Sequence, residues 1–384
     1  MKTLRVGFFT EINRPVVNGV VASVEGLASG LRSRGHEVYC FAPRMPGDEG
    51  VGDVFFRMPS LPLPTRTPYR LTLPLVGRRS VRSVIKRLHV VHVHSPFITG
   101  WMGLRYARRY GMPVVYTYHT QLEAYAHYVP IDPIATRFAT ETLTRTFSNS
   151  VDAVVVPTDA MRVHLRDLGV TTRIDVVPSG IEVEQFSNGR RRDDLRASLG
   201  VGAAPARLLL FVGRLAREKS VDVLFHALAR VRDAALHLVI AGDGPARGEL
   251  EELAAQLGIA QRVRFLGEVR REELPDLYAS SDAFVFPSTS ETQGLVLAEA
   301  LAAGASVIAA DTPQNRDVLG RAGEVVEPTP EAFARALRGL SAPSQERKEA
   351  ARAAAAPFAL EEQIDRILAL YRSLVPPVSI PDSA

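Results

Sequence analysis

The sequence predicts an α/β protein of two doubly wound, Rossmann-like domains. Short apolar runs alternate with stretches of helical spacing through most of its 384 residues. Between Gly180 and Pro205 this alternation stops, and polar and basic residues take its place. Alternating strands and helices are typical of parallel sheets covered on both faces. Two such domains in succession predict a cleft lined by the carboxyl ends of both sheets.

The first half begins with a strand predicted over residues 5–10 and a helix that runs through Leu27 and Leu31 to Gly35. Its further strands are predicted at Glu37–Pro43, Val90–His94, Pro113–Tyr118, Ala153–Pro157 and Asp175–Pro178. Helices are predicted between these strands, near residues 97–110, 135–150 and 159–168.

The second half repeats the pattern after the polar and basic stretch from Gly180 to Pro205, which includes Asn188–Asp194 and which we interpret as the passage between the domains. Its strands are predicted at Arg207–Gly213, Leu236–Gly242, Val263–Gly267, Ala283–Pro287, Ser306–Ala310 and Glu324–Glu327. Helical spacing in Phe358–Leu374 predicts a terminal helix that could pack on either domain.

The composition, 46% hydrophobic and 23% charged, is that of an ordinary globular chain. No apolar run reaches the ~18 residues of a membrane span. The polar residues close to Met1 also leave no room for a signal peptide. The single cysteine, Cys40, lies in an apolar run as a core residue does and excludes an internal disulfide. These features predict a cytoplasmic protein.

The net charge of +4 conceals an asymmetry between the two halves. Residues 1–185 carry 22 Lys and Arg against 15 Asp and Glu, whereas the remainder carries 24 against 27. Residues 54–122 hold 11 basic residues and no acidic one. A basic face without acids favours an anionic surface, either a membrane or a nucleic acid.

The stretch Ser288–Gly304 predicts a junction at which the strand Ala283–Pro287 leads into a helix. Glu291 and Glu299 flank the opening of that helix. Its N–H groups and dipole suit an anion such as a phosphate, and carboxylates beside it can accept hydrogen bonds from sugar hydroxyls. The alternative is structural: Ser288 and Glu291 form a capping box, and Glu299 is a solvated helix residue.

Two cations, Arg214 and Lys219, follow the strand predicted at Arg207–Gly213. At the carboxyl end of a strand they can neutralise a diphosphate without a metal, and the alternative is a solvated loop. The sequence has no Asp-x-Asp pair that would chelate a metal–diphosphate. It also has no dinucleotide fingerprint, Walker loop or Gly-x-Ser-x-Gly elbow.

Several short motifs occur in order along the whole chain. They are Asn18-Gly19-Val20, Arg34-Gly35-His36-Glu37-Val38, Tyr118-His119-Thr120, Gly213-Arg214…Lys219, Ala241-Gly242-Asp243-Gly244-Pro245, Phe265-Leu266-Gly267 and Glu291…Glu299. In this order they resemble glycosyltransferase family 4, the retaining, nucleotide-sugar-dependent enzymes of the GT-B fold. The resemblance implies an N-terminal, acceptor-side domain of residues 1–185 and 358–384, to which the last helix crosses back. Residues 186–357 would form the nucleotide-sugar-binding domain.

The resemblance implies a donor site in the second domain. Arg214 and Lys219 would hold the donor diphosphate and stabilise the charge that develops as it leaves. Glu299 would bond the ribose hydroxyls, and Glu291 would bond a hydroxyl of the transferred sugar. These roles make Arg214, Lys219 and Glu291 candidate catalytic residues.

The resemblance implies further donor contacts from both domains. The amides of Gln293, Gly294 and Leu295 would meet sugar and phosphate oxygens. Gly19 would let the N-terminal loop approach the diphosphate, where a Cβ would intrude. His119 would lie beside the donor sugar and the reacting centre as a catalytic residue. Many family members have an aromatic residue where Gln293 stands, which leaves the preferred sugar open.

The segment His119–Tyr128 is the most informative about the acceptor. It resembles the His-Thr-x-Tyr-Glu-x-Tyr-x-His-Tyr run of bacterial diacylglycerol glucosyltransferases, with Leu122 in place of a tyrosine. The resemblance implies acceptor contacts from Glu123, Tyr125 and His127.

Residues 78–88 predict a helix with an apolar face and a basic rim, as in a helix that lies on anionic lipid. The cations of this rim are Arg78, Arg79, Arg82, Lys86 and Arg87. The apolar, Pro-rich segment 61–75 precedes it and could dip into a bilayer. Alternatively the apolar face packs on its own sheet and the cations are solvated. The two interpretations are compatible if the apolar face packs on the sheet and only the basic residues contact lipid.

These features predict a metal-independent hexosyltransferase without a cofactor, which moves glucose from a UDP-sugar onto a membrane lipid such as 1,2-diacylglycerol. It would act at the inner face of the cell membrane. The alternatives are a soluble sugar, polyol or polysaccharide acceptor, a nucleotide-sugar epimerase, and a nucleic-acid-binding protein. The resemblance favours front-face attack, with His119 as a general base the alternative. His92 and His94 share a strand face, but without a third ligand they do not define a metal site.

Overall fold

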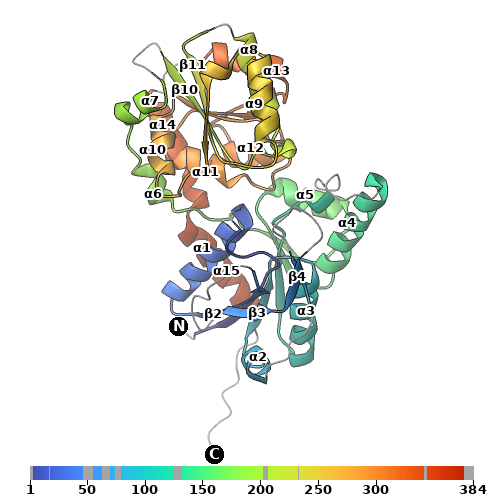
Figure 1. Ribbon diagram of the computed structural model, residues 1–384. Coiled ribbons are helices and arrows are strands. Elements are labelled where there is room, and N and C mark those ends of the chain that lie inside the picture. The colour runs from blue at the N-terminus through green and yellow to red at the C-terminus, as the bar shows by residue number, and fades with distance from the viewer. Residues whose placement is uncertain are drawn as a thin grey trace, which may run out of the picture. The chain divides into compact units, whose positions relative to one another are not determined.

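The structure is a computed structural model that describes residues 3–16, 18–45, 55–62, 70–73, 79–123, 132–201, 206–231, 233–340 and 344–375. The chain divides into two compact units (Figure 1). Unit 1 comprises Met1–Gly180 and Leu360–Ala384, and unit 2 comprises Ile181–Ala359. Each unit is a parallel sheet with helices, so the predicted α/β class is confirmed.

Unit 1 contains a seven-stranded parallel sheet in the order β3-β2-β1-β6-β7-β8-β9. Its strands are β1 Arg5–Phe9, β2 Glu37–Pro43, β3 Phe55–Met58, β6 Val90–Val93, β7 Val114–Thr117, β8 Ala153–Val156 and β9 Ile174–Val176. The helices between them are α1 Gly19–Ser33, α2 Arg79–Ile85, α3 Ile98–Tyr110, α4 Pro133–Ser148 and α5 Asp159–Asp167. A short antiparallel ribbon of β4 Ser60–Pro62 and β5 Arg70–Thr72 is added, where the sequence suggested only an apolar loop.

The sheet of unit 1 has a separate core on each face, because successive side chains of a strand point to opposite sides. Val6 and Phe8 of β1 belong to one core, and Phe9 belongs to the other. The first core includes the terminal helix α15, Leu360–Leu374, which packs on α1 (blue and red in Figure 1). A Cβ at Gly30 of α1 would lie 2.1 Å from the Ile364 side chain, so this glycine permits the close approach. The predicted return of the last helix to the N-terminal half is therefore confirmed.

Unit 2 contains a six-stranded parallel sheet in the order β12-β11-β10-β13-β14-β15. Its strands are β10 Arg207–Val212, β11 Leu236–Ala241, β12 Val263–Gly267, β13 Ala283–Phe286, β14 Val307–Ala310 and β15 Glu324–Val326. Its helices are α6 Val183–Ser187, α7 Asp193–Ser198, α8 Val221–Arg230, α9 Arg247–Gln256, α10 Leu274–Ser280, α11 Leu295–Ala302, α12 Pro313–Leu319, α13 Pro330–Arg338 and α14 Gln345–Ala355. The strands lie within one or two residues of their predicted positions.

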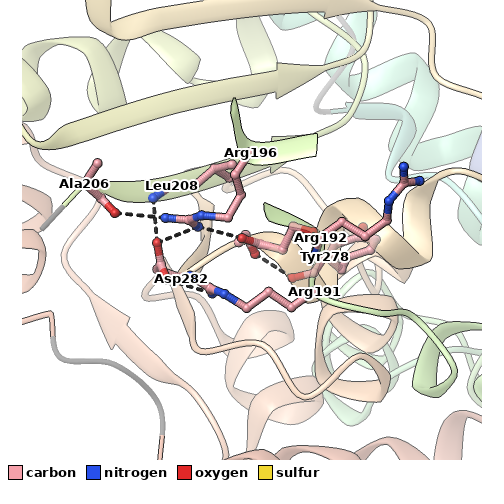
Figure 2. A network of polar contacts seen from close by, with 9 residues as sticks. Arg191, Arg192, Arg196, Ala206, Leu208, Tyr278 and Asp282 are labelled. Carbon is pink, nitrogen blue, oxygen red and sulfur yellow. Dashed lines mark hydrogen bonds and ion pairs between the residues drawn. The ribbon is translucent and has the colours of Figure 1, made fainter. Parts of the chain in front are cut away.

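The basic segment that we interpreted as a passage between domains is instead built into unit 2. Arg196 is buried, and its guanidinium donates to Oδ2 of Asp282 at 2.9 Å and to the Ser280 and Ala206 carbonyls (Figure 2). Arg191 donates to the other oxygen of Asp282 at 3.0 Å. Two arginines of this stretch, Arg191 and Arg196, are thus partners of one carboxylate of unit 2, that of Asp282.

The division between the units falls at Gly180 and Ile181, where the sequence suggested residue 185. Ile181 is buried in the core of unit 2, and its N–H donates to the Phe358 carbonyl at 2.8 Å. In unit 1, a Cβ at Gly180 would lie 2.5 Å from Leu360 Cα. The two points at which the chain passes from one unit to the other, at residues 180–181 and 359–360, are therefore close together. Residues 181–185, which the sequence assigned to the N-terminal domain, therefore belong to unit 2, with Ile181 buried in its core.

Candidate active site

The strand order of unit 2 reverses between β10 and β13, which are neighbours in the sheet. In open α/β sheets such a reversal separates the loops that follow the two strands and leaves a crevice for ligands at their carboxyl ends. The loop after β10 carries Arg214 and Lys219, and the loop after β13 carries Glu291. The topology therefore brings together residues that lie far apart in the sequence.

Lys219 and Glu291 form an ion pair at this position. Nζ of Lys219 lies 2.5 Å from Oε1 of Glu291, and each side chain is 16% exposed. The hydroxyl of Ser288 donates to the same carboxylate oxygen at 2.8 Å. Ser290 ties the loops further, because its hydroxyl donates to the Glu218 carbonyl at 3.2 Å. The Lys219 ammonium is therefore already held in place beside the end of a strand, so it loses little conformational entropy when it binds an anion.

Glycines allow the loops after β10, β11 and β12 to pack against one another. The N–H of Gly242 donates to the Gly267 carbonyl at 2.7 Å. A Cβ at Gly242 would lie 1.9 Å from the Gly213 carbonyl oxygen, and one at Gly244 would lie 2.3 Å from that of Leu215. The Gly-Asp-Gly sequence therefore serves the packing of loops that position Arg214 and Lys219.

The junction after β13 differs in detail from the sequence prediction. Helix α11 begins at Leu295, and its N-cap is Gly294 with a left-handed φ of 74°, a conformation that favours glycine. As a glycine, this N-cap residue has no side chain with which to cap the helix. The alternative of a capping box from Ser288 and Glu291 is thus wrong, because their contact joins two side chains before the helix starts. Gln293 is 3% exposed beside that start.

Glu299 is buried within α11, so the alternative of a solvated helix residue is also wrong. It is 3% exposed; Tyr278 donates to Oε2 at 3.1 Å, and the Arg271 guanidinium lies 3.2 Å from Oε1. Burial raises the pKa of Glu299 above its usual value, and the Arg271 charge and Tyr278 hydrogen bond offset part of that rise. The carboxylate is thereby fixed in orientation while keeping lone pairs for further donors.

Three residues that support the candidate donor site of unit 2 were not predicted from the sequence. Arg271 and Tyr278 hold Glu299, and neither lies in a motif that signals such a role. Asn315 of α12 is fully buried and donates to the Ala310 carbonyl at 2.8 Å and to that of Ser288 at 3.3 Å. A polar residue at a helix start was the only available signal, and it is too common to identify a site.

Arg214 extends into solvent at the end of β10. Within the described part of the chain its guanidinium has neither a hydrogen bond nor an ion pair with another residue. Lys219 is held by Glu291, whereas Arg214 keeps its five donors available.

In unit 1, His119 directly follows Tyr118 beyond the end of β7. Its Nε2 lies 3.0 Å from Nδ1 of His94. Burial lowers the pKa of His119 to about 4, although part of its surface remains accessible. The imidazole is therefore neutral near pH 7. Gly19 is the first residue of α1, whose N-cap Asn18 accepts the N–H of Val21 at 2.9 Å.

Glu123, the predicted acceptor residue, contacts α5. Oε1 of Glu123 lies 2.5 Å from Nε2 of His164, out of line for a good hydrogen bond. Burial is the largest single influence and raises the pKa of Glu123, but the His164 contact, a backbone hydrogen bond and Gln121 together outweigh it, so the pKa lies below its usual value. His164 was not predicted. Tyr125 and His127 lie outside the described residues, and nothing tests their roles.

The basic helix predicted over residues 78–88 is shorter in the structure, where α2 ends at Ile85 and Lys86–Leu88 follow it; the apolar residues of the stretch are part of a core. Ile85 and Leu88 are buried, and Val81 and Val84 pack against the same core. Arg82, Lys86 and Arg87 are exposed. Arg78 and the side chain of Arg79 lie outside the described residues. The structural alternative holds for the apolar face, and the basic rim keeps the remaining cations in solvent.

The described residues contain no group of three His, Cys, Asp or Glu side chains placed to hold a metal ion. His92 is unsuited to the task, because its Nδ1 lies 2.5 Å from the Tyr371 hydroxyl and its Nε2 2.6 Å from that of Thr117. Among helices of the described ranges, none is long and apolar enough to cross a membrane.

Residues 17–185 match the protein family described as Glycosyltransferase Family 4, and residues 206–342 match the one described as Glycosyl transferases group 1. The chain is 33% identical over 323 residues to an alpha-monoglucosyldiacylglycerol synthase of Streptococcus pneumoniae, covering 81% of this chain and 72% of that one. It is 34% identical to a GDP-mannose-dependent alpha-mannosyltransferase of Mycobacterium tuberculosis, with 82% of each covered.

The solved structure of sucrose-phosphate synthase from Thermosynechococcus elongatus matches the fold with a TM-score of 0.77. The match covers 97% of this chain and 99% of that one at 21% identity, so it shows the fold alone. Two doubly wound units, together with these matches, show the GT-B fold. The chain belongs to glycosyltransferase family 4.

Proposed function

We propose that this protein is a retaining hexosyltransferase that moves glucose from UDP-glucose onto a membrane lipid, most simply 1,2-diacylglycerol. It works without a metal ion or cofactor and at the inner face of the cell membrane. Support for the sugar and the lipid comes from the alpha-monoglucosyldiacylglycerol synthase relative and from the resemblance of His119–Tyr128 to such enzymes.

The donor would bind at the paired loops of unit 2. Lys219 and Arg214 would contact the diphosphate, where a fixed cation and a mobile one share its charge. Glu291 would accept a hydrogen bond from a hydroxyl of the sugar through Oε2, since Lys219 contacts Oε1. Glu299 would accept the two ribose hydroxyls, in the orientation set by Tyr278 and Arg271.

In the reaction that we propose, the acceptor hydroxyl oxygen forms a bond to the anomeric carbon on the face that the diphosphate leaves. The bond from that carbon to the phosphate oxygen breaks, and the electron pair departs with the diphosphate. The proton of the attacking hydroxyl passes to a departing phosphate oxygen. The protein mainly stabilises the charge on that oxygen, which is the task of Lys219 and Arg214.

The observation that carries the lipid acceptor is the distribution of exposed apolar side chains. Among the described residues, every large hydrophobic side chain that is well exposed belongs to unit 1. They are Leu61, Leu71, Phe97, Trp101, Ile134, Phe138 and Val163. Ile134 is 80% exposed and Phe138 68% exposed, one turn apart on α4. Exposed apolar groups on the half of the chain that carries the excess of basic residues suit an anionic bilayer.

A donor and acceptor screen tests this proposal. Purified protein would receive radiolabelled UDP-glucose or GDP-mannose, with or without anionic vesicles that contain diacylglycerol. We expect organic-extractable label from UDP-glucose only when diacylglycerol is present, with the α-configured linkage of a retaining enzyme. A product from GDP-mannose alone would favour the mannosyltransferase relatives. A labelled water-soluble product would favour a soluble acceptor, and conversion of the donor without acceptor would indicate an epimerase.

Replacing Ile134 and Phe138 together by serine is expected to reduce the vesicle-bound fraction about tenfold or more. Each apolar side chain contributes roughly 1.5–3 kcal/mol when it leaves water, and a serine contributes little. Flotation with anionic vesicles at low and high salt measures the effect. The loss should be largest at high salt, where attraction through arginines is screened. Glu141→Gln on the same helix keeps the apolar area and should float normally; equal binding of all three proteins would contradict the bilayer contact.

A further inference from the structure

Three histidines cluster at the carboxyl side of the unit 1 sheet. His92 lies in β6, His94 directly follows that strand, and His119 follows the neighbouring strand β7. The ring centroids of His92 and His94 are 4.2 Å apart, and those of His94 and His119 are 5.3 Å apart. Of the three, only His119 is predicted to lie beside the donor sugar and the reacting centre, which leaves the other two without an assigned task.

His92 has no ring nitrogen left for a hydrogen bond to His94. Its Nδ1 is engaged with the hydroxyl of Tyr371 from the terminal helix, and its Nε2 with that of Thr117. Both nitrogens lie within 2.6 Å of these partners, and the residue is completely buried. His94 must therefore find its hydrogen bonds elsewhere.

His94 has one partner for two nitrogens. Its Nδ1 lies 3.0 Å from Nε2 of His119, while its own Nε2 is buried and meets no partner among the described residues. The ring of Phe8 packs edge-on against it at a centroid distance of 4.6 Å. Burial holds the pKa of His94 well below its usual value, so the ring carries a single proton.

The position of that proton follows from the environment of His94. A buried N–H without an acceptor is rarer and costlier in proteins than an acceptor with an unused lone pair. The proton of His94 therefore belongs on Nδ1, where Nε2 of His119 can accept it. Nε2 of His119 must then be unprotonated, and the single proton of that neutral ring must lie on its Nδ1.

We propose that His94 is a positioning residue that donates its Nδ1–H to His119 and thereby holds His119 as the Nδ1–H tautomer. This inference rests on the proposed function for the place of His119 beside the substrate. In this tautomer His119 has no lone pair with which to take the proton of the acceptor hydroxyl. Its Nδ1 already carries a proton and its Nε2 is engaged by His94, which rules out the general-base alternative and leaves the departing phosphate as the proton acceptor.

Nuclear magnetic resonance of the full-length protein, labelled with 15N at histidine, tests the tautomer directly. Two-bond 1H–15N correlations distinguish protonated from unprotonated ring nitrogens, and His119→Asn identifies the His119 signals. The side-chain amide of asparagine can replace an imidazole Nδ1–H, whereas that of glutamine reaches the Nε2 position. His94→Asn should therefore keep His119 as the Nδ1–H tautomer, and His94→Leu and His94→Gln should allow the Nε2–H form to appear.

Kinetics of the same variants separate positioning from folding. We expect His94→Leu to lower kcat about 10- to 100-fold with little change in KM, as is typical when the partner of a functional histidine is lost. His94→Asn should recover most of this loss. A proton on Nε2 of His119 in the unmodified protein, or an unchanged kcat in His94→Leu, would overturn the proposal. If the unmodified protein transferred no sugar at all, the proposed function would fail while the resonance data still decided the tautomer.

Discussion

Replacing Lys219 by alanine is expected to lower kcat by about 10²–10³, the usual loss when one group that stabilises developing negative charge is removed. Lys219 is held against Glu291, with Nζ 2.5 Å from Oε1, and the loops that carry the two residues are tied together by the Ser290 hydroxyl. Its charge therefore needs no reorganisation when the diphosphate leaves. Initial rates at saturating donor, with binding of the nucleotide product measured by calorimetry, separate turnover from affinity.

The fold should tolerate this change. Glu291 is mostly buried but keeps the hydroxyl of Ser288, so we expect the free energy of unfolding to fall by only about 1–3 kcal/mol. Lys219→Arg should recover part of the activity. Arg230→Ala removes an exposed cation that pairs with Glu331 and should leave kcat unaltered. Undiminished kcat in Lys219→Ala would sink the assigned role.

Replacing Arg196 by leucine is expected to lower the free energy of unfolding of unit 2 by about 3–5 kcal/mol, because the change leaves a buried charge without its main partner. Asp282 would keep the backbone N–H of Leu208 at 2.7 Å and the more exposed Arg191. The carbonyls of Ser280 and Ala206 would also lose their donor (Figure 2). Urea unfolding followed by circular dichroism and by fluorescence measures this loss.

Two matched variants identify the cause of that loss. Arg191→Ala removes the outer arginine, which is about half exposed, and should cost only about 1 kcal/mol or less. Combining Arg196→Leu with Asp282→Leu removes both charges and should recover much of the stability, as is common for buried pairs replaced by apolar residues. If the double variant were no more stable than Arg196→Leu alone, lost packing rather than an unpaired charge would be responsible.

The fold could be predicted from the sequence because its strands and helix ends are determined by residue types over a few neighbouring positions. The run Leu208–Val212 is buried on both faces, so every residue is apolar and no knowledge of neighbours is needed to expect a strand. Gly304 ends α11 with a left-handed φ of 74°, as a glycine after a helix predicts. The family motifs added the return of the last helix, which helical spacing alone left open.

The functional half-site was only partly readable, because its geometry depends on contacts between distant segments. Lys219 and Glu291 are 72 residues apart, and only the strand order places their loops together. The motifs named both residues but not the salt bridge. Charge composition even misled at Arg196, because a basic run looks alike whether it meets water or a buried Asp282.

The sequence by itself determined the α/β class, the strands and helices, and the family, since these follow from periodicity, turn residues and ordered motifs. Only the tertiary structure decided that Ser288 and Glu291 do not cap α11, that Glu299 is buried against Tyr278 and Arg271, and that His94 contacts His119. The physical reason is that propensity acts over a few residues, whereas burial and hydrogen-bond partners are set by the segments that packing brings alongside.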